Sequence, residues 1–173
     1  MVVNLTDVFM NEAREQEWEL SYEPDTYSSR LGDFPIKDKS PVQLKASNIG
    51  QSKALVECSV KLTLAFKCDR CLDEVDNTFD LSFSCEAVSP DYEGEDVDSD
   101  APYMEGYHLN VDELINNEIL LNWPVKILCR EDCKGICPVC GSNLNKGECG
   151  CDAFVPDPRM AAIGDIFNAN KEV

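Results

Sequence analysis

The feature that most constrains the fold of this chain is the arrangement of its cysteines. The sequence has 173 residues and ten cysteines, and eight of the ten form four close pairs. The N-terminal twenty residues are acidic and lack the charged-then-apolar pattern of a secretory signal, so we expect a soluble, cytoplasmic protein whose thiols stay reduced. Reduced thiols in four pairs predict two tetrahedral metal sites of the structural zinc type rather than disulfides. The pairs are Cys68 and Cys71, Cys129 and Cys133, Cys137 and Cys140, and Cys149 and Cys151.

The strongest single motif is CPVCG at residues 137–141. Proline fixes one backbone angle and glycine permits a positive φ, so two cysteines can bind one ion from a tight turn. A Cys-x-Cys pair follows after an eight-residue loop. We therefore predict one site from four cysteines, with an exchange of ligands with Cys129 or Cys133 as the alternative. These four are Cys137, Cys140, Cys149 and Cys151.

The second predicted site joins two pairs that are distant in sequence. It takes Cys68 and Cys71 from a CDRC motif and Cys129 and Cys133 from a CREDC motif, with 57 residues between the two pairs. A metal that closes so long a loop would stabilise a small acidic domain. The alternative is a redox role for CDRC alone. A redox Cys-x-x-Cys is expected to open a helix after a strand, whereas a second strand follows here.

Alternation of apolar and polar residues predicts an antiparallel sheet. In residues 54–66 every even position is apolar, and most odd positions are Lys, Glu, Ser or Thr. The alternation resumes over 79–87, and a shorter run at 42–46 precedes the turn sequence SNIGQS. These three strands predict a β-meander, and the pattern at 18–22 suggests a further strand.

Capping signals predict two helices. Asn110 is a plausible N-cap with Glu113 at the capping-box position, the apolar residues that follow keep helical spacing, and Pro124 ends the segment. The sequence Asp157-Pro158-Arg159 predicts a short helix near the C-terminus. The fold class is therefore α+β, an antiparallel β-meander sheet covered by one helix, with a C-terminal cysteine-rich, zinc-finger-like segment and a short terminal helix.

These elements predict two regions. Residues 1–128 form an α+β core domain with an acidic loop at about 89–106, and residues 129–173 form a zinc-binding C-terminal segment. The two remaining cysteines, Cys58 and Cys85, fall on the apolar faces of their strands, so we interpret them as small core residues.

No catalytic constellation is evident in the sequence. The one histidine, His108, has no acid–base partner, and there is no phosphate-binding glycine loop or nucleophile elbow. Four thiolates also close the coordination shell of a metal, so no position is left for a reacting water. We expect a protein that is not an enzyme, with no small-molecule substrate and no membrane span.

The charge of the chain is strongly negative and unevenly distributed. The formal net charge is −18, and residues 71–125 contain fifteen acidic residues but no Lys or Arg. The run DYEGEDVDSD begins at Asp91. This middle region repels phosphate and is not a nucleic-acid-binding face. It is either a solvated acidic loop or a docking surface for a basic protein.

Several motifs in order resemble a known family. CDRC, the helix VDELINNEILLNWPVK, then LCREDCKGICPVCGSNLN, the Cys-x-Cys pair and DPRMAAI are together similar to the large ribosomal RNA subunit accumulation protein family (YceD-like) over roughly Val56–Ile163. The resemblance implies a bacterial or plastid factor needed for accumulation of large-subunit (23S) ribosomal RNA in ribosome biogenesis, without enzymatic activity. It also implies that the CPVCG finger is optional, since some members lack it.

The resemblance implies ribosomal RNA or a ribosomal protein as partner, and a local basic patch is needed for direct RNA contact. Arg70, Arg130 and Lys134 lie beside the predicted metal ligands and would become neighbours if the CDRC and CREDC cysteines share one metal. They would then either contact RNA or screen the negative charge of the zinc thiolates. The alternative function is an acidic adaptor or chaperone-like protein that binds a basic ribosomal protein without touching RNA.

Overall fold

The computed structural model of the chain describes residues 1–50, 52–92 and 102–151. It divides into two compact units. The sheet unit comprises Met1–Phe66 and Glu74–Ile127, and the cysteine unit comprises Lys67–Asp73 and Leu128–Val173. The CDRC turn thus lies in the same unit as the C-terminal cysteines. Most of the acidic run and the helix expected near Asp157 lie outside the described residues.

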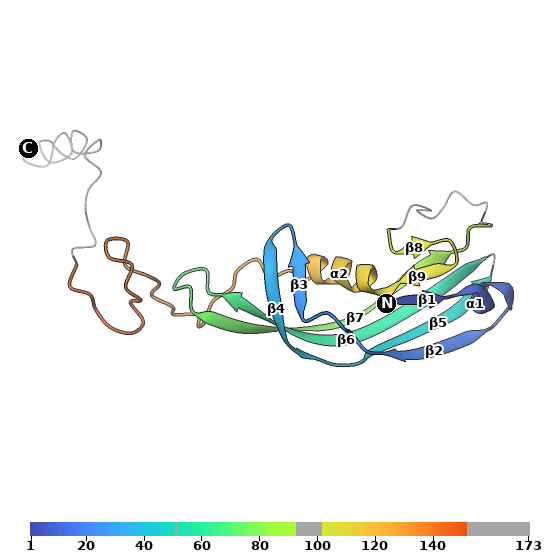
Figure 1. Ribbon diagram of the computed structural model, residues 1–173, viewed down its shortest axis with the longest axis horizontal. Coiled ribbons are helices and arrows are strands. Elements are labelled where there is room, and N and C mark those ends of the chain that lie inside the picture. Colours follow the sequence, from blue (N-terminus) through green and yellow to red (C-terminus); the bar gives the residue numbers. More distant parts are fainter. Residues whose placement is uncertain (51, 93–101, 152–173) are drawn as a thin grey trace, which may run out of the picture. The chain divides into compact units, whose positions relative to one another are not determined.

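A long central strand, β6, organises the sheet unit (Figure 1). Strands β5 and β4 pair with it antiparallel along one edge, β7 pairs with it as the second strand of the expected hairpin, and β2 and β3 extend the sheet beyond β5 and β4. The strands are β2 (Glu15–Leu20), β3 (Thr26–Ser29), β4 (Gly32–Lys39), β5 (Val42–Gly50), β6 (Lys53–Lys67) and β7 (Glu74–Val88).

Strands β4 and β5 share one edge of β6 because the chain breaks its pairing at Ser40-Pro41. Proline has no amide hydrogen, so it cannot donate to the ladder. Ser40 bridges the break: its amide donates to the Lys61 carbonyl at 2.9 Å, and its Oγ accepts from the Lys61 amide at 2.9 Å. Lys61 of β6 therefore keeps both of its backbone hydrogen bonds at the break, one with the Ser40 amide and one with the Ser40 hydroxyl oxygen.

The predicted alternation sets the inward face of the sheet. Every even position of β6 from Ala54 to Phe66 is buried. In β7, Phe79 and Leu81 are buried while Cys85 is half-buried. Residues at alternate positions of a strand point to the same face, so these side chains form one continuous apolar layer. Cys58 lies in this layer and is buried, as expected of a core residue.

The helix α2 (Val111–Leu121) begins at the predicted cap and ends three residues before Pro124, the residue expected to stop it. The Asn110 Oδ1 accepts a hydrogen bond from the Glu113 amide at 3.3 Å, which satisfies one of the free donors of the first turn. Four of its apolar residues enter the core, and the helix packs on β7. The buried residues are Val111, Leu114, Ile115 and Ile119.

Helix α2 is not the whole cover of the sheet, so the expectation of one covering helix holds only in part. A five-residue helix, α1 (Thr6–Met10), packs on β5 and buries Val8 and Phe9. A small antiparallel sheet in the order β1-β9-β8 lies beside it (Figure 1). Its strands are β1 (Val2–Asn4), β8 (Met104–Glu105) and β9 (His108–Asn110). No helix among the described residues is long and apolar enough to cross a membrane.

A cluster of aromatic side chains packs around Trp123, which follows α2. The ring of Trp123 meets Phe34 at 4.9 Å and 69° between ring planes, and Phe66 at 5.2 Å and 72°. These edge-to-face contacts are the favoured geometry of aromatic pairs. Trp123 therefore anchors the chain that leaves α2 to the aromatic side chains of β4 and β6.

Candidate metal centres

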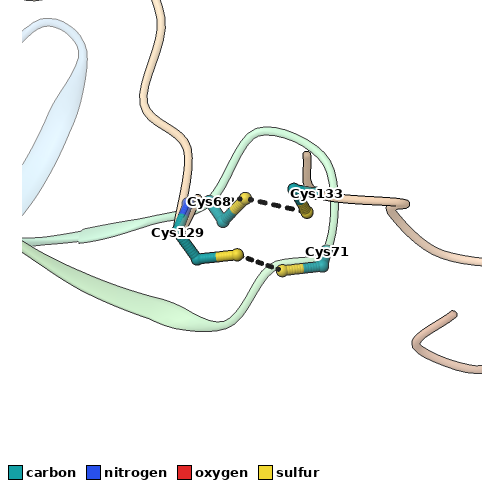
Figure 2. Close-up of side chains that lie close together, drawn as sticks. All are labelled: Cys68, Cys71, Cys129 and Cys133. Atoms are coloured by element: carbon teal, nitrogen blue, oxygen red, sulfur yellow. Dashed lines mark hydrogen bonds between the residues drawn. The ribbon is translucent and has the colours of Figure 1, made fainter. Parts of the chain in front are cut away.

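The first centre consists of Cys68, Cys71, Cys129 and Cys133 (Figure 2). Their four Sγ atoms all lie within 4.8 Å of one another. The Sγ atoms of Cys68 and Cys133 are 3.8 Å apart, and those of Cys71 and Cys129 are 3.5 Å apart. Zinc–sulfur bonds in a tetrahedron place the sulfur atoms about 3.8 Å apart, whereas a disulfide needs about 2.05 Å. The geometry thus fits a tetrathiolate metal centre.

A tight turn between β6 and β7 presents the first two cysteines. The Cys68 amide donates to the Asp73 carbonyl at 2.8 Å, and the Leu72 amide donates to the Cys68 carbonyl at 3.0 Å. Leu72 adopts a φ of 63°, a left-handed conformation that is rare for a residue with a side chain. The turn that brings Cys68 and Cys71 into one group therefore includes a strained backbone conformation at Leu72.

Hydrogen bonds to sulfur lower the pKa of Cys68 and of Cys133 in the first centre, whereas the pKa of Cys71 and that of Cys129 are raised. Burial raises the pKa of the Cys68 thiol, but the backbone amides of Cys129 and Cys71 outweigh burial and bring its pKa down to about 6. The Cys129 amide lies 3.4 Å from the Cys68 Sγ. Since the thiolate is the form that binds metal, amides aimed at sulfur favour the ligand state.

The second centre consists of Cys137, Cys140, Cys149 and Cys151, whose Sγ atoms also lie within 4.8 Å of one another. The CPVCG turn is closed by the Gly141 amide, which donates to the Cys137 carbonyl at 2.9 Å. Gly141 has the expected positive φ of 74°. A hydrogen bond with the Ser142 side chain lowers the pKa of Cys140 to about 6.

The structure brings the eight cysteines together in the two groups that their spacing predicted. Neither Cys129 nor Cys133 enters the second group, so the alternative exchange of ligands is not seen. All ten cysteines are free thiols. Both groups could hold a metal ion, and their binding of one stays a prediction.

The described part of the cysteine unit, residues 67–73 and 128–151, has almost no hydrophobic core. Among its described residues the buried apolar side chains are all cysteines, namely Cys68, Cys71, Cys133 and Cys137. Four sulfur atoms cannot supply the burial that folds a segment of this size, and small domains in this position depend on metals or disulfides. We therefore expect a metal ion bound by the thiol groups to stabilise this part of the chain.

Polar side chains between the CPVCG turn and the Cys-x-Cys pair brace the first centre. We call residues 141–148 the finger loop. From this loop the Asn143 Nδ2 donates to an Asp73 carboxylate oxygen at 2.8 Å, and the Lys146 Nζ lies 3.4 Å from the other. The Asn145 Nδ2 donates to the Cys133 Sγ at 3.2 Å. Nothing in the sequence marked these asparagines, because loop asparagines usually serve turns.

The three basic residues proposed as partner contacts surround Cys133, but two of them are engaged within the unit. The Arg70 Nη1 donates to the Cys133 carbonyl at 2.8 Å, and the Arg130 Nη2 donates to the Asn145 Oδ1 at 2.8 Å. Lys134 is exposed and uses its backbone amide to donate to the same Asn145 oxygen. The described part of the unit contains five basic and five acidic residues, so it has no net positive charge before thiolates are counted.

The remaining candidate residues lie in the sheet unit. Burial raises the pKa of Cys58 to about 12 and that of Cys85 to about 11, so both thiols stay protonated. His108 is exposed on β9.

Comparison with known proteins places these centres inside a matched region. The family model described as large ribosomal RNA subunit accumulation protein YceD matches residues 56–167. A curated protein of Arabidopsis thaliana, large ribosomal RNA subunit accumulation protein YCED homolog 1, chloroplastic, is 26% identical over 163 residues, which cover 78% of this chain and 50% of that protein. The chain thus spans about half the length of this relative. No solved structure matches.

Proposed function

The chain belongs to the large ribosomal RNA subunit accumulation protein YceD family, and on this basis we propose that it is a non-enzymatic, zinc-binding factor that supports accumulation of large-subunit (23S) ribosomal RNA. We place its action in ribosome biogenesis in the cytoplasm of its source organism. The chloroplast location printed for the Arabidopsis relative belongs to that protein alone.

The observation that carries this proposal is the pair of four-cysteine groups within the matched region. All eight cysteines fall in residues 56–167. Sulfur-only ligand sets with closed tetrahedral geometry are typical of structural zinc, whereas catalytic zinc keeps a position open for water. Zinc is the metal we propose because it accepts four thiolates without a redox change. This ligand chemistry supports a scaffolding role rather than catalysis.

A depletion experiment tests the proposed role. We expect depletion of the protein to lower large-subunit ribosomal RNA relative to small-subunit RNA, and to reduce large-subunit particles on a gradient. Wild type should restore the ratio and Cys68→Ser should not. Cys85→Ser is the matched control, because it removes a thiol that lies outside both centres, and it should restore the ratio. An unchanged RNA ratio after depletion would refute the proposed role.

Direct RNA contact is the finer part of the proposal, with Arg70, Arg130 and Lys134 as the contact residues. Their grouping around the first centre supports it, whereas the balanced charge of the unit favours screening of the thiolates. Lys134→Glu is the cleanest test, because its side chain is exposed and the backbone bond to Asn145 remains. RNA affinity should fall and its salt dependence weaken, while Arg30→Glu, an exposed site in the sheet unit, should change neither.

The charge of the middle region supports an acidic adaptor as the second candidate. Residues 71–125 contain no Lys or Arg, and the exposed positions of β7 include Glu74, Asp76, Asp80 and Glu86. Such a surface would bind a basic ribosomal protein and keep it from RNA. Replacing the acidic residues of 91–100 by their amides should then abolish capture of basic ribosomal proteins in a pull-down. Retained capture would reject the adaptor.

A further inference from the structure

We propose that the two metal centres load cooperatively, because the finger loop of the second centre forms the outer shell of the first. This inference rests on the proposed zinc binding. It goes beyond that proposal by making each centre depend on the occupancy of the other. The finger would then strengthen metal binding at the first centre rather than be an optional addition to it.

The finger loop is held at both ends by ligands of the second centre. Its eight residues lie between Cys140 and Cys149, so a metal in the second centre would fix both ends of the loop. With its ends fixed, the conformational freedom of the loop falls sharply. The side chains that reach the first centre therefore acquire their positions when the second centre is occupied.

Asn145 links the finger loop to the first centre. Its Nδ2 donates to the Cys133 Sγ at 3.2 Å, and its Oδ1 accepts from the Lys134 amide and the Arg130 Nη2, both at 2.8 Å. One side chain thus holds a ligand sulfur and the backbone that follows it. Groups that orient metal ligands in this way typically account for about 10- to 100-fold in metal affinity.

Backbone hydrogen bonds also connect the two centres. Only three residues separate Cys133 from Cys137, and within them the Ile136 amide donates to the Arg70 carbonyl at 3.1 Å. Ile136 also forms an isolated antiparallel bridge with Asn143. The CDRC turn, the short link and the finger loop are therefore hydrogen-bonded to one another in sequence.

The described residues of the cysteine unit offer no other source of order than the two centres. In residues 67–73 and 128–151 no aliphatic or aromatic side chain is buried, so these residues supply no apolar core that could hold one centre in place while the other is empty. If the second centre strengthens binding at the first, the first must strengthen binding at the second by the same factor. The chain should consequently pass from no metal to two metals with little of the one-metal form.

Native mass spectrometry of the full chain tests this directly. Reduced, metal-free protein is mixed with one equivalent of Zn²⁺, left to equilibrate, and the populations with zero, one and two ions are measured. For wild type we expect the zero- and two-ion forms to dominate. Asn145→Ala, which removes all three hydrogen bonds, should raise the one-ion form and weaken one site by about 10- to 100-fold.

Two further variants separate the contributions. Asn145→Asp keeps an oxygen for Lys134 and Arg130 but replaces the donor to the Cys133 sulfur by a second acceptor, so it should raise the one-ion form as Asn145→Ala does. Lys134→Ala is the control, since its amide is retained, and it should match wild type. The double variant Cys149→Ser/Cys151→Ser should weaken the remaining first centre by about tenfold or more in a competition assay with a chromophoric chelator.

Failure of the coupling and failure of zinc binding itself would give different results in these experiments. A wild-type chain that binds two ions but forms mainly the one-ion species at one equivalent would overturn the coupling and leave zinc binding intact. So would an unchanged first-centre affinity in the double variant. A wild-type chain that takes up no ion would overturn zinc binding itself, and the coupling with it.

Discussion

Cys68 and Cys133 are 65 positions apart in the sequence, yet their Sγ atoms lie 3.8 Å apart in the first centre. The two residues come from the turn after β6 and from the segment that follows the last described helix. A shared metal would close the long loop between them, which restricts the unfolded chain and stabilises the folded one. Such a metal would make the order of residues 128–151 depend on metal coordination rather than on hydrophobic burial.

Metal removal should therefore unfold one unit and spare the other. We expect a strong chelator, under reducing conditions, to abolish amide hydrogen-exchange protection in residues 128–151 while β6 keeps its protection. The reason is that the sheet unit buries a large apolar cluster, whereas the cysteine unit buries only cysteines among its described residues. Adding Zn²⁺ back should restore protection. Unchanged protection in 128–151 after chelation would contradict this prediction.

Two glycines of the cysteine unit offer a matched comparison. Gly135 and Gly141 both have positive φ, 80° and 74°, so Ala at either position costs about 1–2 kcal/mol in backbone energy. A Cβ at Gly135 would also lie 3.1 Å from the Arg70 carbonyl oxygen, whereas a Cβ at Gly141 would have no neighbour within 4 Å. Gly135→Ala should also strain the hydrogen bond from Ile136 to Arg70.

We accordingly expect Gly135→Ala to weaken metal binding by about 100-fold and Gly141→Ala by about tenfold, on the scale of about 1.4 kcal/mol per factor of ten. Competition with a chromophoric chelator measures both. Equal losses in the two variants would mean that the close approach to Arg70 contributes nothing.

The sequence predicted the elements whose signals are local. The alternation in β6 and the pairing of Asn110 with Glu113 before α2 act through neighbouring residues, so they can be seen in a single segment. Strand β4 gave no such signal because Pro35 interrupts it and its pairing with β6 shifts register between Ile36 and Asp38. The pairing of β1 with β9 joins residues 2–4 to 108–110, a long-range contact that no local pattern marks.

The same distinction applies to the metal centres. Cysteine pairs are few and chemically specific, so spacing predicted the CPVCG and Cys-x-Cys set, and exclusion then left the CDRC and CREDC pairs as the second set. The bracing residues could not. Asn145 and Asn143 resemble ordinary loop asparagines until the chain brings them beside Cys133 and Asp73. Arg70 and Arg130 looked available for a partner, yet their guanidinium groups bond within the unit.

The aromatic cluster after α2 should be important for the stability of the sheet unit. Trp123→Ala removes edge-to-face contacts with Phe34 and Phe66 and should lower the free energy of unfolding by about 2–3 kcal/mol, since the indole is half-buried. Val125→Ala is the control, because that side chain is fully exposed, and it should change stability by less than about 0.5 kcal/mol. Urea unfolding of the metal-loaded protein, followed by circular dichroism, gives both values. Equal stability of the two variants would show that the cluster is not part of the cooperative core.

Thiol reactivity should divide the ten cysteines into two classes. Burial raises the pKa of Cys58 to about 12 and that of Cys85 to about 11, so at pH 8 only about one Cys58 thiol in ten thousand is ionised, and the thiolate is the reactive form. The pKa of Cys129 and that of Cys151 are also raised to about 12 in the folded cysteine unit, but removal of metal should unfold this unit and return its thiols to their ordinary pKa. In the presence of chelator, the eight cysteines of the two centres should therefore be alkylated by iodoacetamide at pH 8, while Cys58 and Cys85 react only after the sheet unit is unfolded in urea. With metal bound, all ten should react slowly, because coordination and burial both make the sulfur lone pairs inaccessible.

Peptide mapping by mass spectrometry identifies each modified residue. Rapid modification of Cys58 in the folded protein would show that β6 does not bury it, and equal rates with and without chelator at Cys140 would show that no metal protects the second centre.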